Sequence, residues 1–205
     1  MRGKDIEKLL SRIPAHPTPR AELEQYSTPA DLAVPLLLEA RALGDIEGKR
    51  VLDLGCGTGM LAMGAMLLGA ASAVGVDVDE GALRVARQEA ARVGVDAQWI
   101  ASDIVGWRGE GDVVVMNPPF GAQVKGADAP FLEAAMASAP VVYTFVNAPS
   151  RDFTEDYAAA RGFARTHAWA MRFPLRHQYR HQTKAVQEVD VVVLRLQRSS
   201  GTKVP

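Results

Sequence analysis

Apolar positions in the chain fall into two kinds of run. Five runs are short, rich in valine or other apolar residues, and bounded by Gly, Pro or Asp, which is typical of buried strands. They are residues 50–55, 72–79, 96–103, 111–120 and 141–147. Helical spacing of apolar residues separates them, at residues 58–70, 80–94, 128–139 and 150–162. Because strands and helices alternate, we predict a parallel sheet with right-handed crossovers.

The last two predicted strands, residues 167–173 and 189–197, have no helical pattern between them. Two strands joined without a crossover helix are expected to pair antiparallel, so they should form a hairpin at one edge of the sheet. The fold class predicted is therefore α/β, with a seven-stranded, mostly parallel sheet, an antiparallel C-terminal hairpin, and helices on both faces.

The residues before the first strand predict two helices. Residues 1–13 have the spacing of a short amphipathic helix, and three prolines at positions 14–19 predict a non-helical linker. A second helix is expected at residues 28–43, with Thr28 as its N-cap and Pro29 at its first position. We expect one domain over residues 1–205, with a frayed tail at 198–205.

Composition limits the kinds of function. No apolar run reaches the roughly 18 residues of a membrane span, and the N-terminus lacks the apolar segment of a secretory signal. Cys56 is the single cysteine, so no internal disulfide can form, and we expect a cytoplasmic protein. The net charge of -1 argues against coating nucleic acid by charge alone, although basic residues gather in the C-terminal third.

The glycine-rich turn after the first strand predicts a cofactor site. It reads Asp53-Leu54-Gly55-Cys56-Gly57-Thr58-Gly59, a G-x-G-x-G spacing and not the G-x-G-x-x-G of dinucleotide sites. Gly55 and Gly57 let the backbone approach a ligand. Asp53 would repel a pyrophosphate but can meet a methionine ammonium, which favours S-adenosylmethionine. A purely structural glycine turn is the alternative.

Three further positions fit the same cofactor. Asp77 ends the second strand, where an acidic residue can accept both ribose hydroxyls, and Val78 would lie against the adenine. Asp103 ends the third strand and can accept the adenine amine. The alternative for Asp77 is to cap the next helix, although Asp79 suits that role better, and the alternative for Asp103 is to face water. Cys56 is expected to be a packed side chain and not a nucleophile.

The fourth strand leads directly into Asn117-Pro118-Pro119-Phe120. An adenine N6 amine is a poor nucleophile because its lone pair is delocalised into the ring. The Asn117 side-chain oxygen and the Pro118 carbonyl are two acceptors that can favour a pyramidal, nucleophilic nitrogen. Pro118 and Pro119 stiffen the loop, and Phe120 offers a ring on which the base can stack. This chemistry needs no metal.

Several segments together resemble the small-subunit rRNA adenine-N6 methyltransferases of archaea and eukaryotes, the methyltransferase-like protein five group, within the class I (Rossmann-like) methyltransferases. The resemblance covers roughly residues 20–197. The segments that carry it are Leu23–Thr28, Asp53–Gly57, Leu67–Ala70, Gly75–Asp79, Met116–Gly121, Lys125–Asp128 with Phe131-Leu132, and Glu188–Asp190.

The resemblance implies roles for residues that spacing alone does not assign. Residues 1–30 would be an arm over the cofactor pocket, with Gln25 and Thr28 contacting S-adenosylmethionine. Lys125 and Gly126 would lie beside the substrate. A lysine-rich stretch of the family reads here as residues 177–184, where Tyr179 and Lys184 would contact the RNA. The family also implies small-subunit rRNA as substrate and a small zinc-binding activator protein that adds to a sheet edge.

Two other functions share these motifs. The same Asn-Pro-Pro loop serves enzymes that methylate glutamine side-chain amides, because that nitrogen is equally delocalised, but those enzymes usually carry a larger helical N-terminal domain. A non-catalytic scaffold that binds S-adenosylmethionine is the third possibility, and the intact Asn117, Pro118 and Pro119 argue against it.

Overall fold

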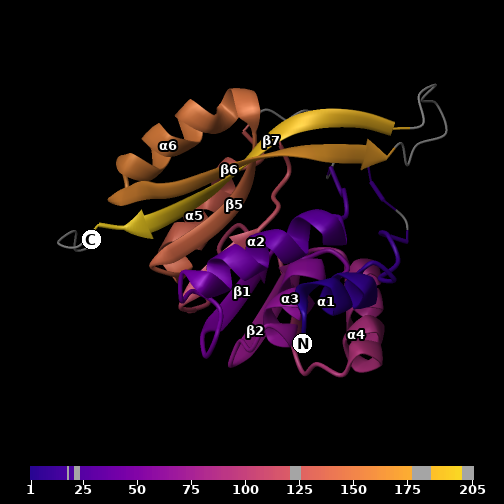
Figure 1. The fold of residues 1–205 in the computed structure, drawn as a ribbon. Helices are drawn as coiled ribbons and strands as arrows, with labels where there is room; N and C mark the ends of the chain where they lie inside the picture. Colours follow the sequence, from indigo (N-terminus) through magenta and orange to yellow (C-terminus); the bar gives the residue numbers. More distant parts are fainter. Residues whose placement is uncertain (18, 21–23, 121–125, 177–185, 200–205) are drawn as a thin grey trace.

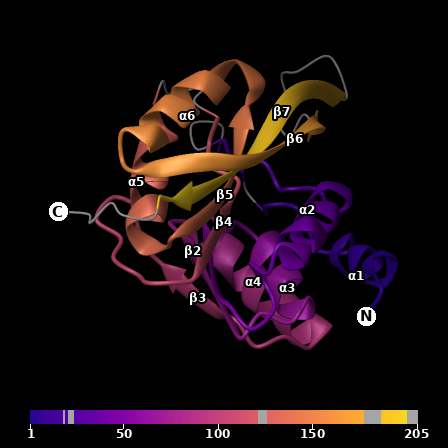
Figure 2. The ribbon, with the colours of Figure 1, turned by 60° about the vertical axis from the view of Figure 1, so that its left-hand side comes forward.

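The computed structural model describes residues 1–17, 19–20, 24–120, 126–176 and 186–199, leaving aside the side chains of 174–176 and 186–187. A single twisted sheet runs through it, with helices on either side (Figures 1 and 2). Its strands are β1 (Arg50–Leu54), β2 (Ser72–Asp77), β3 (Gln98–Ala101), β4 (Val113–Met116), β5 (Val141–Asn147), β6 (Phe163–Arg176) and β7 (Val186–Arg198).

The strand order is β3-β2-β1-β4-β5-β7-β6. Strands β1 to β5 pair in parallel, whereas β7 is antiparallel to both β5 and β6. The predicted α/β fold with an antiparallel C-terminal pair at one edge is therefore confirmed. The returning strand β7 takes the inner place beside β5, and β6 forms the edge, so the pair extends the sheet beyond the parallel strands (Figure 1).

The helices cover both faces of the sheet, as predicted. They are α1 (Gly3–Leu10), α2 (Ala30–Ala42), α3 (Met60–Leu67), α4 (Glu80–Val93), α5 (Ala129–Ser138) and α6 (Arg151–Ala159), with a 3-10 turn, η2 (Ala148–Ser150), before the last. α1, α2 and α3 gather on one face, and α5 and α6 lie on the other (Figures 1 and 2). None of the described helices is long and apolar enough to cross a membrane.

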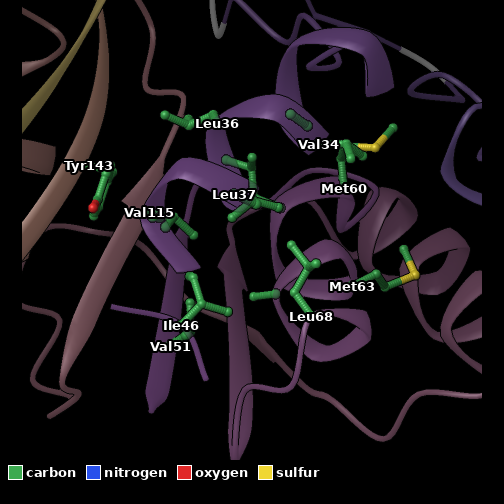
Figure 3. Close-up of a cluster of buried hydrophobic side chains, with 14 of the residues drawn as sticks. Val34, Leu36, Leu37, Ile46, Val51, Met60, Met63, Leu68, Val115 and Tyr143 are labelled. Carbon is green, nitrogen blue, oxygen red and sulfur yellow. The ribbon is translucent and has the colours of Figure 1, made fainter. Parts of the chain in front are cut away.

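The larger part of the core lies between α2, α3 and the sheet (Figure 3). Leu37 of α2 and Met63 of α3 are fully buried there, and Leu37 lies beside Val115 of β4. The second core cluster lies on the opposite face, where α5 packs on the middle strands. Apolar side chains thus cover both faces of β1 and β4, which explains why these strands read as continuous apolar runs.

The start of α2 differs from the sequence prediction. The helix begins at Ala30 with Pro29 as its N-cap, and no side chain caps it. Thr28 as N-cap is wrong because its hydroxyl instead accepts a hydrogen bond from Asn117. The cap of α4 agrees with the prediction, since Asp79 accepts the main-chain N–H groups of the helix's first turn.

Candidate active site

A cavity of about 380 Å³ opens at the carboxyl ends of the parallel strands, where ligands of open α/β sheets bind. Six parts of the chain line it: the N-terminal segment, the glycine-rich turn with the start of α3, the end of β2 with the residue after it, the residues that follow β3, the residues that follow β4, and the start of α5. The lining residues are His16, Glu24–Thr28, Gly55–Thr58, Met60, Leu61, Val76–Val78, Ser102–Ile104, Asn117, Pro119, Ala127 and Phe131.

The glycine-rich turn is held against the end of β2. Gly55 and Gly57 have φ angles of 73° and 52°, in the left-handed region that favours glycine. The Gly57 N–H donates to the Asp77 carboxylate over 2.8 Å. A side chain added at Gly57 would meet no atom within 4 Å, so the space beside it is open.

Asp77 and Val78 both line the cavity. One Asp77 oxygen accepts from Gly57 and the other accepts the Asp79 N–H at 2.9 Å, so the carboxylate is fixed at the tip of β2. Val78 is 54% exposed, so its apolar side chain is open to contact with a ligand. Asp103, after β3, also lines the cavity, and its carboxylate accepts the Val105 N–H at 2.9 Å.

Asp53 lies behind the turn and is not among the lining residues. Its carboxylate is only 2% exposed and accepts the Ala62 N–H of α3 at 2.9 Å. Burial, with a smaller contribution from the charge of Asp77, raises the pKa of Asp53 to about 7, and the hydrogen bond from Ala62 partly offsets this. The predicted contact of Asp53 with a cofactor ammonium remains a prediction.

Cys56 is a buried free thiol at the cavity wall. Burial is the largest cause that raises its pKa well above the ordinary value, and the charges of Asp53 and Asp77 add to it. A thiol with a raised pKa is a poor nucleophile, which agrees with the packing role expected of it.

The Asn-Pro-Pro-Phe loop begins directly after β4. Asn117 donates from Nδ2 to the Thr28 hydroxyl at 3.1 Å. Its Oδ1 is buried and accepts no hydrogen bond from any described residue. Pro118 is buried, whereas Pro119 lines the cavity together with Asn117. Asn117 thus lines the cavity, and its side-chain oxygen has no donor among the described residues.

Phe120 is the last described residue of the loop and is half-buried. Its ring meets Phe173 of β6 edge-on, with centroids 5.9 Å apart, and its main-chain N–H donates to the Glu24 carboxylate at 2.7 Å. Phe120 is not among the lining residues of the cavity, so its stacking on a substrate base remains a prediction.

The N-terminal segment contributes both predicted and unpredicted residues to the cavity wall. Gln25 donates to Asp79 at 3.3 Å and accepts the Arg20 N–H at 2.8 Å. Two further lining residues, Glu24 and His16, were missed by the sequence analysis. His16 lies 3.5 Å from the Asp79 carboxylate; burial lowers the pKa of His16, and Asp79 partly offsets this.

Glu24 is buried with a φ of 47°, which no sequence pattern reveals. Three predicted substrate residues, Lys125, Tyr179 and Lys184, lie outside the described residues. Gly126 is described and has a φ of 79°, in the turn that leads into α5. The described part of the chain holds no group of three or more His, Cys, Asp or Glu side chains arranged for a metal ion.

Comparison with known proteins places this site in a family. The chain is 31% identical to the rRNA N(6)-adenosine-methyltransferase METTL5 of Danio rerio, over 95% of this chain and 98% of that protein. The chain belongs to the METTL5 family. The resemblance seen in the sequence motifs is thereby confirmed.

Solved structures agree with METTL5 membership. A candidate RNA methyltransferase from Pyrococcus horikoshii is 36% identical, with a TM-score of 0.91 and coverage of 97% of this chain and 98% of that one. Magnesium protoporphyrin IX methyltransferase from Synechocystis, crystallised with bound S-adenosylmethionine, has a TM-score of 0.67 over 82% of this chain and 79% of that one. At 18% identity, this second likeness shows the fold alone.

The sequence model of a second family, described as ribosomal protein L11 methyltransferase (PrmA), matches residues 31–118. That match takes in the glycine-rich turn and ends within the Asn-Pro-Pro loop. The likeness to METTL5 continues through the rest of the chain, including β5 to β7. The chain is a methyltransferase of the class I fold, and the part it shares with that second family includes the glycine-rich turn and Asp77, which line the cavity.

Proposed function

We propose that the chain transfers a methyl group from S-adenosylmethionine to the N6 amine of an adenosine in small-subunit rRNA. The observation that carries this proposal is Asn117, which lines the cavity and whose buried Oδ1 accepts no hydrogen bond from a described residue. A buried polar atom without a partner costs free energy unless a ligand satisfies it. The N–H of an amine substrate is such a ligand, and METTL5 relatives are named for adenosine N6 methylation.

The cavity fits S-adenosylmethionine. Open space lies beside Gly57, and Asp77 presents a fixed carboxylate where the ribose hydroxyls of a nucleoside would bind. Val78 and Asp103 would hold the adenine, and Gln25 and Thr28 would close over the cofactor. Gly55 and Cys56 would contact its methionine part, with Asp53 supporting the turn from behind. When bound, the cofactor supplies an electrophilic methyl group on a sulfonium.

The loop residues prepare the acceptor nitrogen. Asn117 Oδ1 accepts one N–H of the substrate amine, and the Pro118 carbonyl accepts the other. Two acceptors set at an angle favour a pyramidal nitrogen, which localises the lone pair. Because Pro118 and Pro119 fix the φ angles of the loop, these acceptors are in place before the substrate arrives. Phe120 would stack on the base.

The RNA would bind beside this loop, at Phe120, Lys125, Gly126, Tyr179 and Lys184. A duplex adenine cannot reach the cavity without flipping, so an unpaired adenosine is the substrate expected. Basic residues of β6, Arg165 and Arg172 among the described ones, would contact phosphate. Activity should then fall steeply as salt rises.

A small zinc-binding protein would assist as activator. The sheet offers it two edge strands, β3 and β6, to which a further strand can add. We place the reaction in the cytoplasm, in keeping with the single, unpaired Cys56.

The experiment that tests this function is transfer of radiolabelled methyl from S-adenosylmethionine to rRNA, total protein and DNA in parallel, with and without a zinc-binding activator. Label in N6-methyladenosine of small-subunit rRNA is the expected result. Label confined to protein would favour glutamine methylation, and no transfer to any substrate would favour a scaffold.

A variant links this transfer to the loop. Asn117→Ala should abolish it while leaving cofactor affinity within about twofold, because the acceptor is lost and Asp77 is untouched. Gln88→Ala, a similar amide truncation on the exposed face of α4, is the control and should keep full activity. Loss of both cofactor binding and transfer in Asn117→Ala would show that Asn117 is structural.

A further inference from the structure

The described end of the N-terminal arm makes a sharp turn between the two halves of the active site. The Tyr26 N–H donates to the Glu24 carbonyl at 2.8 Å, which closes the turn around Gln25. Neighbouring side chains therefore point to different elements. Glu24 contacts the loop after β4, whereas Gln25 contacts Asp79, at the start of α4.

Thr28 sets the orientation of the Asn117 side chain. An amide has a donor end and an acceptor end on opposite sides, so engaging one end fixes where the other points. The Asn117 Nδ2 donates to the Thr28 hydroxyl at 3.1 Å, and Oδ1 is left as the end without a partner among the described residues. Thr28 is 7% exposed and lines the cavity, so the pair lies away from bulk water.

Glu24 anchors the backbone of the same loop. Pro118 and Pro119 carry no N–H, so Phe120 provides the first main-chain donor after Asn117. That N–H donates to the Glu24 carboxylate at 2.7 Å. A carboxylate acceptor gives a short, charge-assisted hydrogen bond, and Glu24 is only 6% exposed. Two residues of the arm therefore hold the loop: Thr28 contacts the Asn117 side chain, and Glu24 contacts the Phe120 backbone.

The backbone of Glu24 supports a functional role for its side chain. Glu24 is the single non-glycine residue with positive φ in the described part of the chain, at 47°. Glycine would adopt this conformation without steric cost. Strained conformations of this kind gather at functional sites. The position thus keeps a strained backbone together with a buried carboxylate that reaches the catalytic loop.

We propose that Glu24 and Thr28 are positioning residues for methyl transfer: Thr28 aims the Asn117 oxygen at the substrate amine, and Glu24 fixes the loop through the Phe120 N–H. This inference rests on the function proposed above, and it states that the N-terminal arm orients the Asn117 oxygen. Removing either contact should lower the turnover number at saturating cofactor and RNA, since binding of the saturating partners no longer limits the rate.

The test uses the full chain with four variants. Glu24→Ala removes the acceptor and Glu24→Gln keeps a neutral one; Thr28→Val removes the hydroxyl and Thr28→Ser keeps it. The controls are Thr154→Val, which removes a hydrogen-bonded hydroxyl from a fully buried threonine of α6, and Glu110→Gln at an exposed position. Turnover number, RNA KM, cofactor affinity and hydrogen exchange at the Phe120 amide are measured for each.

We expect Glu24→Ala to speed exchange at the Phe120 amide and to lower the turnover number, each about tenfold or more, with Glu24→Gln between it and the native chain. Thr28→Val should lower the turnover number about tenfold and Thr28→Ser should restore most of it. An unchanged Phe120 exchange in both Glu24 variants, or unchanged turnover in Glu24→Ala and Thr28→Val, overturns the proposal. Should Glu24→Ala not fold, Glu24→Gln carries the exchange measurement.

The two proposals fail in different ways. If the native chain methylates no RNA, the proposed function is wrong, while exchange at the Phe120 amide still reports whether Glu24 holds the loop. If the native chain methylates RNA and the variants equal the two controls, the function stands and the positioning role is wrong.

Discussion

Replacing Asp53 by asparagine should remove a pH-dependent loss of stability from the ligand-free protein. The Asp53 carboxylate is almost completely buried, and burial raises its pKa from 3.8 to about 7. An acid whose pKa is higher in the folded than in the unfolded chain binds its proton more tightly when folded. Its contribution to stability is therefore complete below about pH 4 and is lost as the pH rises through 7. Asparagine has no proton to lose, and its amide oxygen can still accept the Ala62 N–H.

The size of the effect follows from the same pKa. The pKa rises by about three, and each pKa unit corresponds to about 1.4 kcal/mol, so Asp53 would lower stability by at most about 4 kcal/mol between pH 4 and pH 8. Any movement of α3 that lets water reach the carboxylate reduces this figure. At pH 8 the Asp53→Asn variant should be the more stable protein, and the two should be nearly equal only at about pH 4, where the loss begins.

Urea unfolding of both proteins at about pH 4, 5, 6, 7 and 8 measures the difference directly. The two curves of unfolding free energy against pH should diverge between about pH 4 and pH 7. Parallel curves would refute the reasoning, because they would show that Asp53 keeps an ordinary pKa. Calorimetric titration with S-adenosylmethionine in two buffers of different ionisation enthalpy tests the predicted contact between Asp53 and the cofactor. A nearby ammonium would lower the pKa of Asp53, so the native chain would release a proton on binding. The Asp53→Asn variant would show no such release.

Three other substitutions test the packing around the site. Gly57→Ala should weaken S-adenosylmethionine binding in a calorimetric titration, because its Cβ would occupy the open space beside the turn, and the positive φ should cost roughly 1 kcal/mol of folding stability; equal affinity would contradict the assignment of this turn. Gly75→Ala places a Cβ 2.5 Å from the Trp99 ring, so urea unfolding should show a loss of about 1–3 kcal/mol and an altered Trp fluorescence, and an unperturbed spectrum would argue against this contact. Arg195→Met leaves the buried Asp45 without its 2.7 Å ion-pair partner and should cost about 3–5 kcal/mol in thermal unfolding, part of which Asp45→Asn in the same chain should restore.

The sequence was sufficient for the fold because its strongest signals are local. The valine-rich run that became β4 and the helical spacing of apolar residues that became α4 are specified by their own residues. The missing helix between the last two strands predicted their antiparallel pairing. Their order in space was not predictable from periodicity, because the choice of β7 as the neighbour of β5 depends on long-range pairing.

The site was predicted less completely, for a physical reason. Asp77 and Asn117 sit at strand ends, where topology alone brings them to the cavity. Thr28 looked like a helix cap because capping depends on nearby sequence, whereas its partner Asn117 is distant in the chain. Glu24 could not be identified, since neither a positive φ nor a contact with Phe120 leaves a periodic signal.

The turn at Glu24–Thr28 has a consequence for how the enzyme loads. The same few residues wall the cofactor cavity and hold the acceptor loop. Swinging this segment outward to admit S-adenosylmethionine would release Asn117 and Phe120 at the same moment. While the pocket is open, Asn117 and Phe120 would not be held in place for methyl transfer. The methyl donor should therefore bind before the adenosine, and it should not react until the segment has closed.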